Sequence, residues 1–120
     1  MLDGNVETMI LAVLNDGSNY GYQLVQELNA KSPELLQFGE GTIYPVLHRM
    51  EKRGVINAFW QEGETGRKRK YYRLTTRGKR QLEENLSQWQ SLVEVMTGFM
   101  EDLPENLKEK RTRKIKGEPA

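Results

Sequence analysis

The chain begins with an apolar pattern of helical spacing. Hydrophobic residues recur every three or four positions at Val6, Met9, Ile10, Val13 and Leu14. This spacing predicts an amphipathic helix, which ends at the turn-forming residues 15–18. A second helix is predicted over about residues 20–30, with Leu24, Val25 and Leu28 buried. It ends before Ser32-Pro33, because proline disfavours the helical conformation of the preceding residue.

A third helix is marked by signals at both ends. Thr42 is the expected N-cap, which places Pro45 in the first turn, where its missing N–H is least costly. Gly54 follows the last helical residue, as a C-terminal glycine commonly does. The predicted buried stripe is Ile43, Val46, Leu47 and Met50, and the opposite face carries Tyr44, His48, Arg49 and Lys52.

Two strand-like runs follow at residues 55–60 and 69–74, joined by a polar loop with glycines. They predict a β-hairpin, with Tyr72 and Leu74 on one face of the second strand. Trp60, at the end of the first strand, is expected in the core. The fold class is therefore mainly α with a small β-hairpin. Three helices followed by a hairpin indicate a winged helix-turn-helix domain over residues 1–74.

A long helix is predicted from the N-cap Thr75 to about Glu101. Its apolar residues alternate steps of four and three, which is a heptad pattern. The members of this seam are Leu82, Leu86, Trp89, Val93, Met96 and Met100, continued by Leu103, with a second stripe at Leu92, Val95 and Phe99. Such a helix needs a partner, and a second copy is the commonest one. Residues 75–103 are therefore predicted to form a dimerisation helix that makes a homodimer.

The residue types present argue against catalysis. The 120 residues include no cysteine and one histidine, His48. Thiolate chemistry, histidine metal clusters and nucleophile–base pairs are therefore excluded or hard to build. We expect neither an enzyme nor a bound metal or cofactor. The sequence also has no apolar run of membrane-spanning length and no N-terminal signal pattern, so a cytoplasmic location is expected.

Charge is unevenly distributed along a chain of net charge +1. Between Arg49 and Arg80, basic residues far outnumber the acidic Glu51, Glu62 and Glu64. A locally basic face on a nearly neutral chain favours a polyanionic partner, although such faces are often merely solvated. A further basic segment, residues 104–120, is predicted to be a disordered tail.

Two segments together favour double-stranded DNA as that partner. The third helix would present its N-terminal end to the base edges of the major groove. The run Gly66-Arg67-Lys68-Arg69-Lys70 would form a wing whose cations contact phosphates. A second hypothesis is a protein-interaction module whose wing binds an acidic protein.

These segments resemble the signature regions of the PadR family of regulators. Residues 41–56, GTIYPVLHRMEKRGVI, are similar to the family's recognition helix, and residues 66–78, GRKRKYYRLTTRG, to its wing and the start of its last helix. Tyr20-Gly21-Tyr22 resembles a motif at its second helix. The resemblance implies a dimeric repressor that binds an inverted-repeat operator and is released by a small molecule. The DNA-binding residues that it implies are Tyr20, Tyr22, Thr42, Tyr44, Pro45, Arg49, Arg67, Lys68 and Lys70.

The single C-terminal helix resembles that of a compact subgroup that includes multidrug-sensing regulators. In that subgroup a tryptophan and its symmetry mate sandwich planar aromatic ligands, and Trp89 stands at the matching position. The resemblance therefore implies a planar aromatic or phenolic effector near Trp89, Val93 and Met96. The alternative is that Trp89 simply fills the dimer interface, as large aromatic anchors do.

Overall fold

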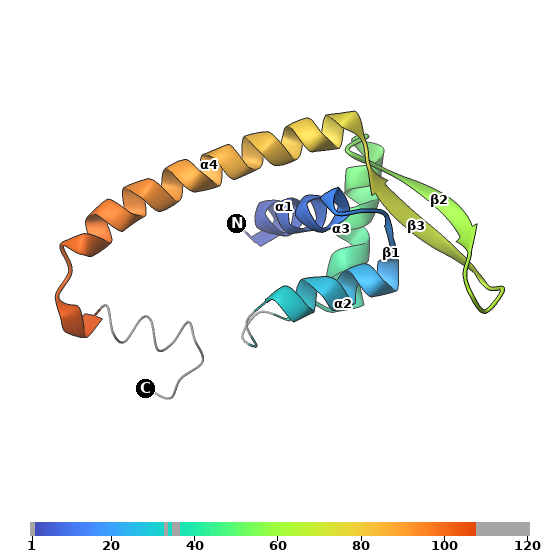
Figure 1. Ribbon diagram of the computed structural model, residues 1–120, viewed down its shortest axis with the longest axis horizontal. Helices are drawn as coiled ribbons and strands as arrows, with labels where there is room; N and C mark the ends of the chain where they lie inside the picture. The colour runs from blue at the N-terminus through green and yellow to red at the C-terminus, as the bar shows by residue number, and fades with distance from the viewer. Residues whose placement is uncertain (1, 33, 35–36, 108–120) are drawn as a thin grey trace.

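The computed structural model describes residues 2–32, 34 and 37–107 of the chain. Its elements are α1 (Leu2–Asn15), β1 (Asn19–Tyr20), α2 (Gly21–Lys31), α3 (Glu40–Lys52), β2 (Ile56–Glu62), β3 (Lys68–Leu74) and α4 (Thr76–Glu101). Figure 1 shows α1, α2 and α3 gathered together, with the β2–β3 hairpin projecting from them and α4 running along α1. The predicted fold class, mainly helical with a small hairpin, is confirmed.

The core is formed where the first three helices meet the base of the sheet. It contains the apolar stripes predicted for these helices, together with hairpin residues and the first turns of α4. Its largest fully buried side chains are Ile10, Leu11, Leu24, Ile43, Leu47, Met50, Ile56, Val6 and Val55. Burial of this apolar surface is the main favourable term in folding, so the helical periodicity of the sequence located the core correctly.

The start of α3 differs from the prediction. The N-cap is Gly39, whose carbonyl accepts hydrogen bonds from the backbone N–H groups of Thr42 (3.1 Å) and Ile43 (3.2 Å). Thr42 therefore lies inside the helix, and the prediction that it caps α3 is wrong. Pro45 consequently lies beyond the first turn, and the Gly41 carbonyl four residues earlier cannot receive the usual helical hydrogen bond.

The predicted glycine signal at the end of α3 is confirmed. Gly54 has a φ of +78°, a left-handed conformation that glycine adopts without steric cost. Its N–H donates a hydrogen bond to the Glu51 carbonyl (3.1 Å), and the N–H of Val55 donates one to the Met50 carbonyl (3.2 Å). These two bonds are those of a Schellman motif, and they direct the chain from the helix into β2.

The sheet contains a strand that the sequence analysis missed. Its order is β1-β3-β2, with β1 antiparallel to the inner strand β3 through the pairs Asn19↔Tyr72 and Tyr20↔Tyr71. The short β1 ties the turn after α1 to the base of the hairpin. Two residues are too few for a periodic signal, which explains why they were not predicted.

The last long helix begins and ends as expected. Thr75 is the N-cap, and its hydroxyl accepts a hydrogen bond from the Gly78 N–H at 3.0 Å. Leu82 is 6% exposed and belongs to the core. Asn85 and Trp89 still lie beside α1, and the remainder of α4 extends past the other helices (Figure 1). Leu82 is therefore already buried by its own chain, and its assignment to the dimer interface is corrected.

The remaining seam and stripe residues of α4 lie on the surface of the single chain. Exposed large hydrophobic residues on this helix are Leu86, Trp89, Leu92, Val93, Val95, Met96 and Phe99, whereas Met100 is half-buried. No helix within the described ranges is long and apolar enough to cross a membrane. The predicted basic tail is described only to residue 107, with a helical turn at 105–107; its remainder lies outside the described residues.

Candidate nucleic-acid interface

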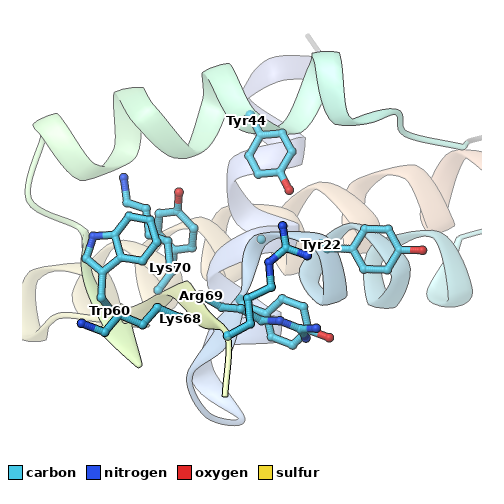
Figure 2. Close-up of a pocket in the computed structure, with 10 residues that line it drawn as sticks. Tyr22, Tyr44, Trp60, Lys68, Arg69 and Lys70 are labelled. Carbon is cyan, nitrogen blue, oxygen red and sulfur yellow. The ribbon is translucent and has the colours of Figure 1, made fainter. Parts of the chain in front are cut away.

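An open groove of about 540 Å³ separates the helices from the hairpin. Its helical side comes from the start of α2 and from α3, and its other side from β2 and β3. The lining residues are Tyr20, Gly21, Tyr22, Tyr44, Trp60, Arg67, Lys68, Arg69, Lys70 and Tyr72. Figure 2 shows Tyr22 and Tyr44 on the helices and Trp60, Lys68 and Lys70 on the hairpin. Aromatic rings and cations thus face the same space, which suits a polyanion that also offers flat apolar surfaces.

Tyr44 owes its position to a glycine. A Cβ atom at Gly21 would lie 2.6 Å from Cε1 and 3.0 Å from the hydroxyl oxygen of Tyr44. The absence of a side chain at Gly21 therefore lets the phenol ring lie against the start of α2. Burial, with the negative charge of Glu40 as a smaller cause, raises the pKa of the Tyr44 phenol above its usual value. A phenol hydroxyl in the groove can donate a hydrogen bond.

The face of the hairpin turned toward the helices changes character along its length. Near the base, the cross-strand pairs Ile56↔Leu74 and Ala58↔Tyr72 pack against the core. The next pairs on the same face are Trp60↔Lys70 and Glu62↔Lys68. Alternation along each strand keeps these residues on one side, so the core-facing side of the sheet becomes the wall of the groove.

Lys70 is held in place by neighbours from both sides. Its Nζ lies 3.4 Å from Oε1 of Glu51 on α3 and 5.5 Å from the ring centroid of Tyr72. The ion pair joins β3 to α3, although a partly exposed pair of this kind contributes little to stability. Its role is geometric, since it sets the position of one groove cation relative to α3.

The other face of the sheet carries a layer of rings and arginines. Tyr71 lies between Tyr20 (5.4 Å between ring centroids) and Phe59 (5.7 Å). The guanidinium of Arg69 lies 4.4 Å from the ring centroid of Tyr20, and the guanidinium of Arg73 lies 4.9 Å from the ring centroid of Phe59. These ring and cation–π contacts hold Tyr20 and Arg69 at the edge of the groove. Arg69 was expected among the wing cations, but it is not among the DNA-binding residues that the family resemblance implies.

The residues predicted to contact DNA fall into two groups. Tyr20, Tyr22, Tyr44, Arg67, Lys68 and Lys70 line the groove. Thr42, Pro45 and Arg49 lie outside it, but all are exposed on the surface of α3. The structure therefore makes the second group accessible beside the groove, and their contact with bases stays a prediction.

Trp60 is the clearest correction among the candidate residues. Its side chain is 67% exposed and lines the groove, so the prediction that it lies in the core is wrong. Trp60 does share one face of β2 with Ile56 and Ala58, which pack in or against the core. The hairpin, however, extends past the helices, and no core remains beneath the pair Trp60↔Lys70.

A second, smaller hollow of about 300 Å³ lies between α1 and α4. Trp89 borders it together with polar residues that include Gln81, Asn85 and Gln88. Nearby, the Asn85 amide donates to the Thr8 hydroxyl at 3.0 Å. Trp89, Val93 and Met96, the predicted effector residues, are 41%, 53% and 46% exposed. Only Trp89 of these three borders the hollow, so one chain by itself does not enclose a ligand there.

Three helices, a projecting hairpin and a cationic groove beside the exposed face of α3 define a winged helix DNA-binding protein. A model of the PadR-like transcriptional regulator family matches residues 10–84. An uncharacterized protein of Lysinibacillus sphaericus is 36% identical over 103 residues, which cover 86% of this chain and 94% of that protein. The chain therefore belongs to the PadR-like family and is a DNA-binding transcriptional regulator.

Solved structures agree with this assignment. A PadR-like transcriptional regulator from Bacillus cereus has a TM-score of 0.77 and 34% identity, covering 86% of this chain and 98% of that one. A PadR family transcription regulator from Clostridium difficile has a TM-score of 0.72 and 32% identity, covering 79% of this chain and 97% of that one. These relatives regulate transcription and are not enzymes, in agreement with the sequence-based expectation.

Proposed function

We propose that the protein is a homodimeric repressor that binds an inverted-repeat DNA operator and is released by a planar aromatic or phenolic effector. The observation that carries the proposal is the groove, where side chains from α2, α3 and the wing meet on one surface. Cations and aromatic rings line it together. This mixture favours DNA over an acidic protein, because a nucleic acid offers sugars and bases as well as phosphates.

The two groups of predicted contact residues have different roles in this proposal. Thr42, Tyr44 and Pro45 lie in the first half of α3, the end that enters the major groove in helix-turn-helix proteins. Arg49, one turn later, reaches a guanine or a phosphate. Arg67, Lys68 and Lys70 contact phosphates, which determine affinity and orientation more than sequence preference. An operator-binding protein shares a compartment with its DNA, so the proposal includes a cytoplasmic location.

Dimerisation rests on the apolar face of α4. Leu86, Trp89, Val93 and Met96 are each more than 40% exposed. A continuous exposed patch of large apolar side chains marks an interaction surface, and its heptad spacing suits another helix. Two chains joined by α4 would place two recognition helices on the same DNA, which is why an inverted repeat is proposed.

The operator proposal can be tested by selecting duplexes from a randomised pool with the purified protein. We expect the recovered sequences to share an inverted repeat whose half-sites are centred about 10 base pairs apart, or a multiple of that distance. Recovery of single, unpaired half-sites would contradict the dimeric mode of binding. Recovery of no shared sequence would contradict specific recognition.

The effector proposal concerns the tryptophan on α4. In the dimer, Trp89 of each chain would stack on one face of a flat ligand, with Val93 and Met96 beside it. The chain has two tryptophans, so a Trp60→Phe variant leaves Trp89 as the only indole emitter. Titration of this variant with planar aromatic cations and phenolic acids should quench its emission and release bound DNA. An unchanged emission across the panel would assign Trp89 to packing alone.

A further inference from the structure

Trp60 is an unusual side chain for a position on a surface strand. It is 67% exposed, the highest value among the exposed large hydrophobic residues outside α4. The indole lies on β2 directly across from Lys70, and Lys68 follows on the same face. Neither the core nor the aromatic layer on the other side of the sheet contains it. Its exposure therefore has no structural explanation within the described chain.

The surroundings of Trp60 indicate what would cover it. The indole shares the groove with Lys68, Lys70 and the Tyr44 ring (Figure 2). Any polyanion that Lys68 and Lys70 attract into the groove has its phosphates next to this ring. In a DNA backbone each phosphate is joined to a deoxyribose, which presents carbon-bound hydrogens, and these pack well on an aromatic face. The indole N–H can in addition donate a hydrogen bond to a phosphate oxygen.

We propose that Trp60 is a DNA-contacting residue of the wing, whose indole packs on the deoxyribose of the strand held by Lys68 and Lys70. The inference rests on the proposed operator binding and adds to it a contact that is not ionic. The wing then contributes two kinds of affinity. The cations contribute a part that depends on salt, and Trp60 contributes a part that does not.

The salt dependence of binding separates these two parts. The logarithm of a protein's affinity for duplex DNA falls linearly with the logarithm of the salt concentration. The slope of this line is proportional to the number of phosphates that the protein neutralises. Removing a cation such as Arg67 should lower the slope of log affinity against log salt by about 1. Removing the indole should weaken binding equally at every salt concentration, because no counterion is released at this contact.

The experiment measures anisotropy of a labelled duplex carrying the selected operator, with the full chain and its variants, from low to moderate salt. We expect Trp60→Ala to weaken binding about tenfold, the order of magnitude for losing one buried apolar side-chain contact, with the wild-type salt slope. Trp60→Phe should recover part of the loss. The matched control is Gln61→Ala, the adjacent exposed residue on the opposite face of β2, which should bind like the wild type.

Fluorescence gives a second readout that does not depend on the alanine variant being folded. A Trp89→Phe variant keeps Trp60 as the only indole, and its emission should shift or be quenched when the duplex is added. The Trp60→Phe variant, which reports on Trp89, should respond much less to DNA.

Three results would overturn the inference while leaving operator binding intact. The first is Trp60→Ala binding within twofold of the wild type. The second is a lowered salt slope in that variant, which would mean that the indole acts through the cations. The third is Trp60 emission that is insensitive to bound duplex. If instead the wild-type protein fails to bind any duplex at low salt, the proposed function itself is contradicted.

Discussion

Val93→Asp is expected to convert the protein from a dimer to a monomer and to weaken operator binding by about a hundredfold or more. The Val93 side chain is 53% exposed in the single chain and lies within the α4 seam. In a dimer it would be buried, and an unpaired carboxylate there is strongly unfavourable. Without the dimer each half-site binds alone and loses the effective concentration that linkage provides. Light scattering for mass and duplex binding for affinity measure both effects.

A matched control places the same charge elsewhere on the helix. Ser87 is exposed and lies on the side of α4 away from the seam, so Ser87→Asp should remain dimeric and bind DNA like the wild type. A wild-type protein of only 13.9 kDa mass at micromolar concentration would contradict the proposed dimer. A dimeric Val93→Asp variant would show that another surface joins the two chains.

Gly78→Ala is expected to destabilise the fold by about 3 kcal/mol, because it introduces overpacking that nearby groups cannot relieve. A Cβ at Gly78 would lie 2.0 Å from the backbone carbonyl oxygen of Val55 and 2.8 Å from Cδ1 of Leu74. The Val55 carbonyl also accepts a hydrogen bond from the Thr75 N–H at 3.2 Å, and the Thr75 hydroxyl donates to the Gly54 carbonyl at 2.7 Å. The close approach at Gly78 therefore allows the start of α4 to pack directly against the turn between α3 and β2. Denaturant unfolding followed by circular dichroism measures the loss.

The control for this prediction is on the same helix. A Cβ at Gly98 would meet no atom within 4 Å beyond its chain neighbours and the adjacent backbone of its own helix, and the residue lies within α4. Gly98→Ala should therefore stabilise the protein by about 1 kcal/mol, the difference in helix propensity between the two residues. Equal stability of the Gly78→Ala and Gly98→Ala variants would show that Gly78 does not pack closely against the Val55 carbonyl.

Sequence periodicity was sufficient to predict the helices and their buried faces. The stripe of Ile43, Val46, Leu47 and Met50 is buried as expected, and each of the four is at most 2% exposed. Helical spacing repeats over several turns, so each helix contains enough positions to fix its buried side. The family resemblance likewise identified most residues that line the groove, because they lie in three continuous segments, at residues 20–22, 41–56 and 66–78.

The features that escaped prediction depend on contacts between distant segments. Trp60 has the phase of a core residue, and only the length of the hairpin relative to the helices shows that it is exposed. The strand β1 and the role of Gly21 as a seat for Tyr44 both arise from three-dimensional packing. The start of α3 was misplaced because Thr42 is a good N-cap residue type, whereas the chain uses the Gly39 carbonyl one turn earlier.

The most direct test of the account is the salt dependence of duplex binding by the wild-type chain and the Arg67→Ala variant. If the wing and the start of α3 form the DNA-binding surface, wild-type affinity should fall steeply and linearly on logarithmic axes as salt rises. The Arg67→Ala variant should bind more weakly, and its slope of log affinity against log salt should be shallower by about 1. Equal affinities and equal salt slopes for the two proteins would place the DNA-binding surface elsewhere and contradict the account.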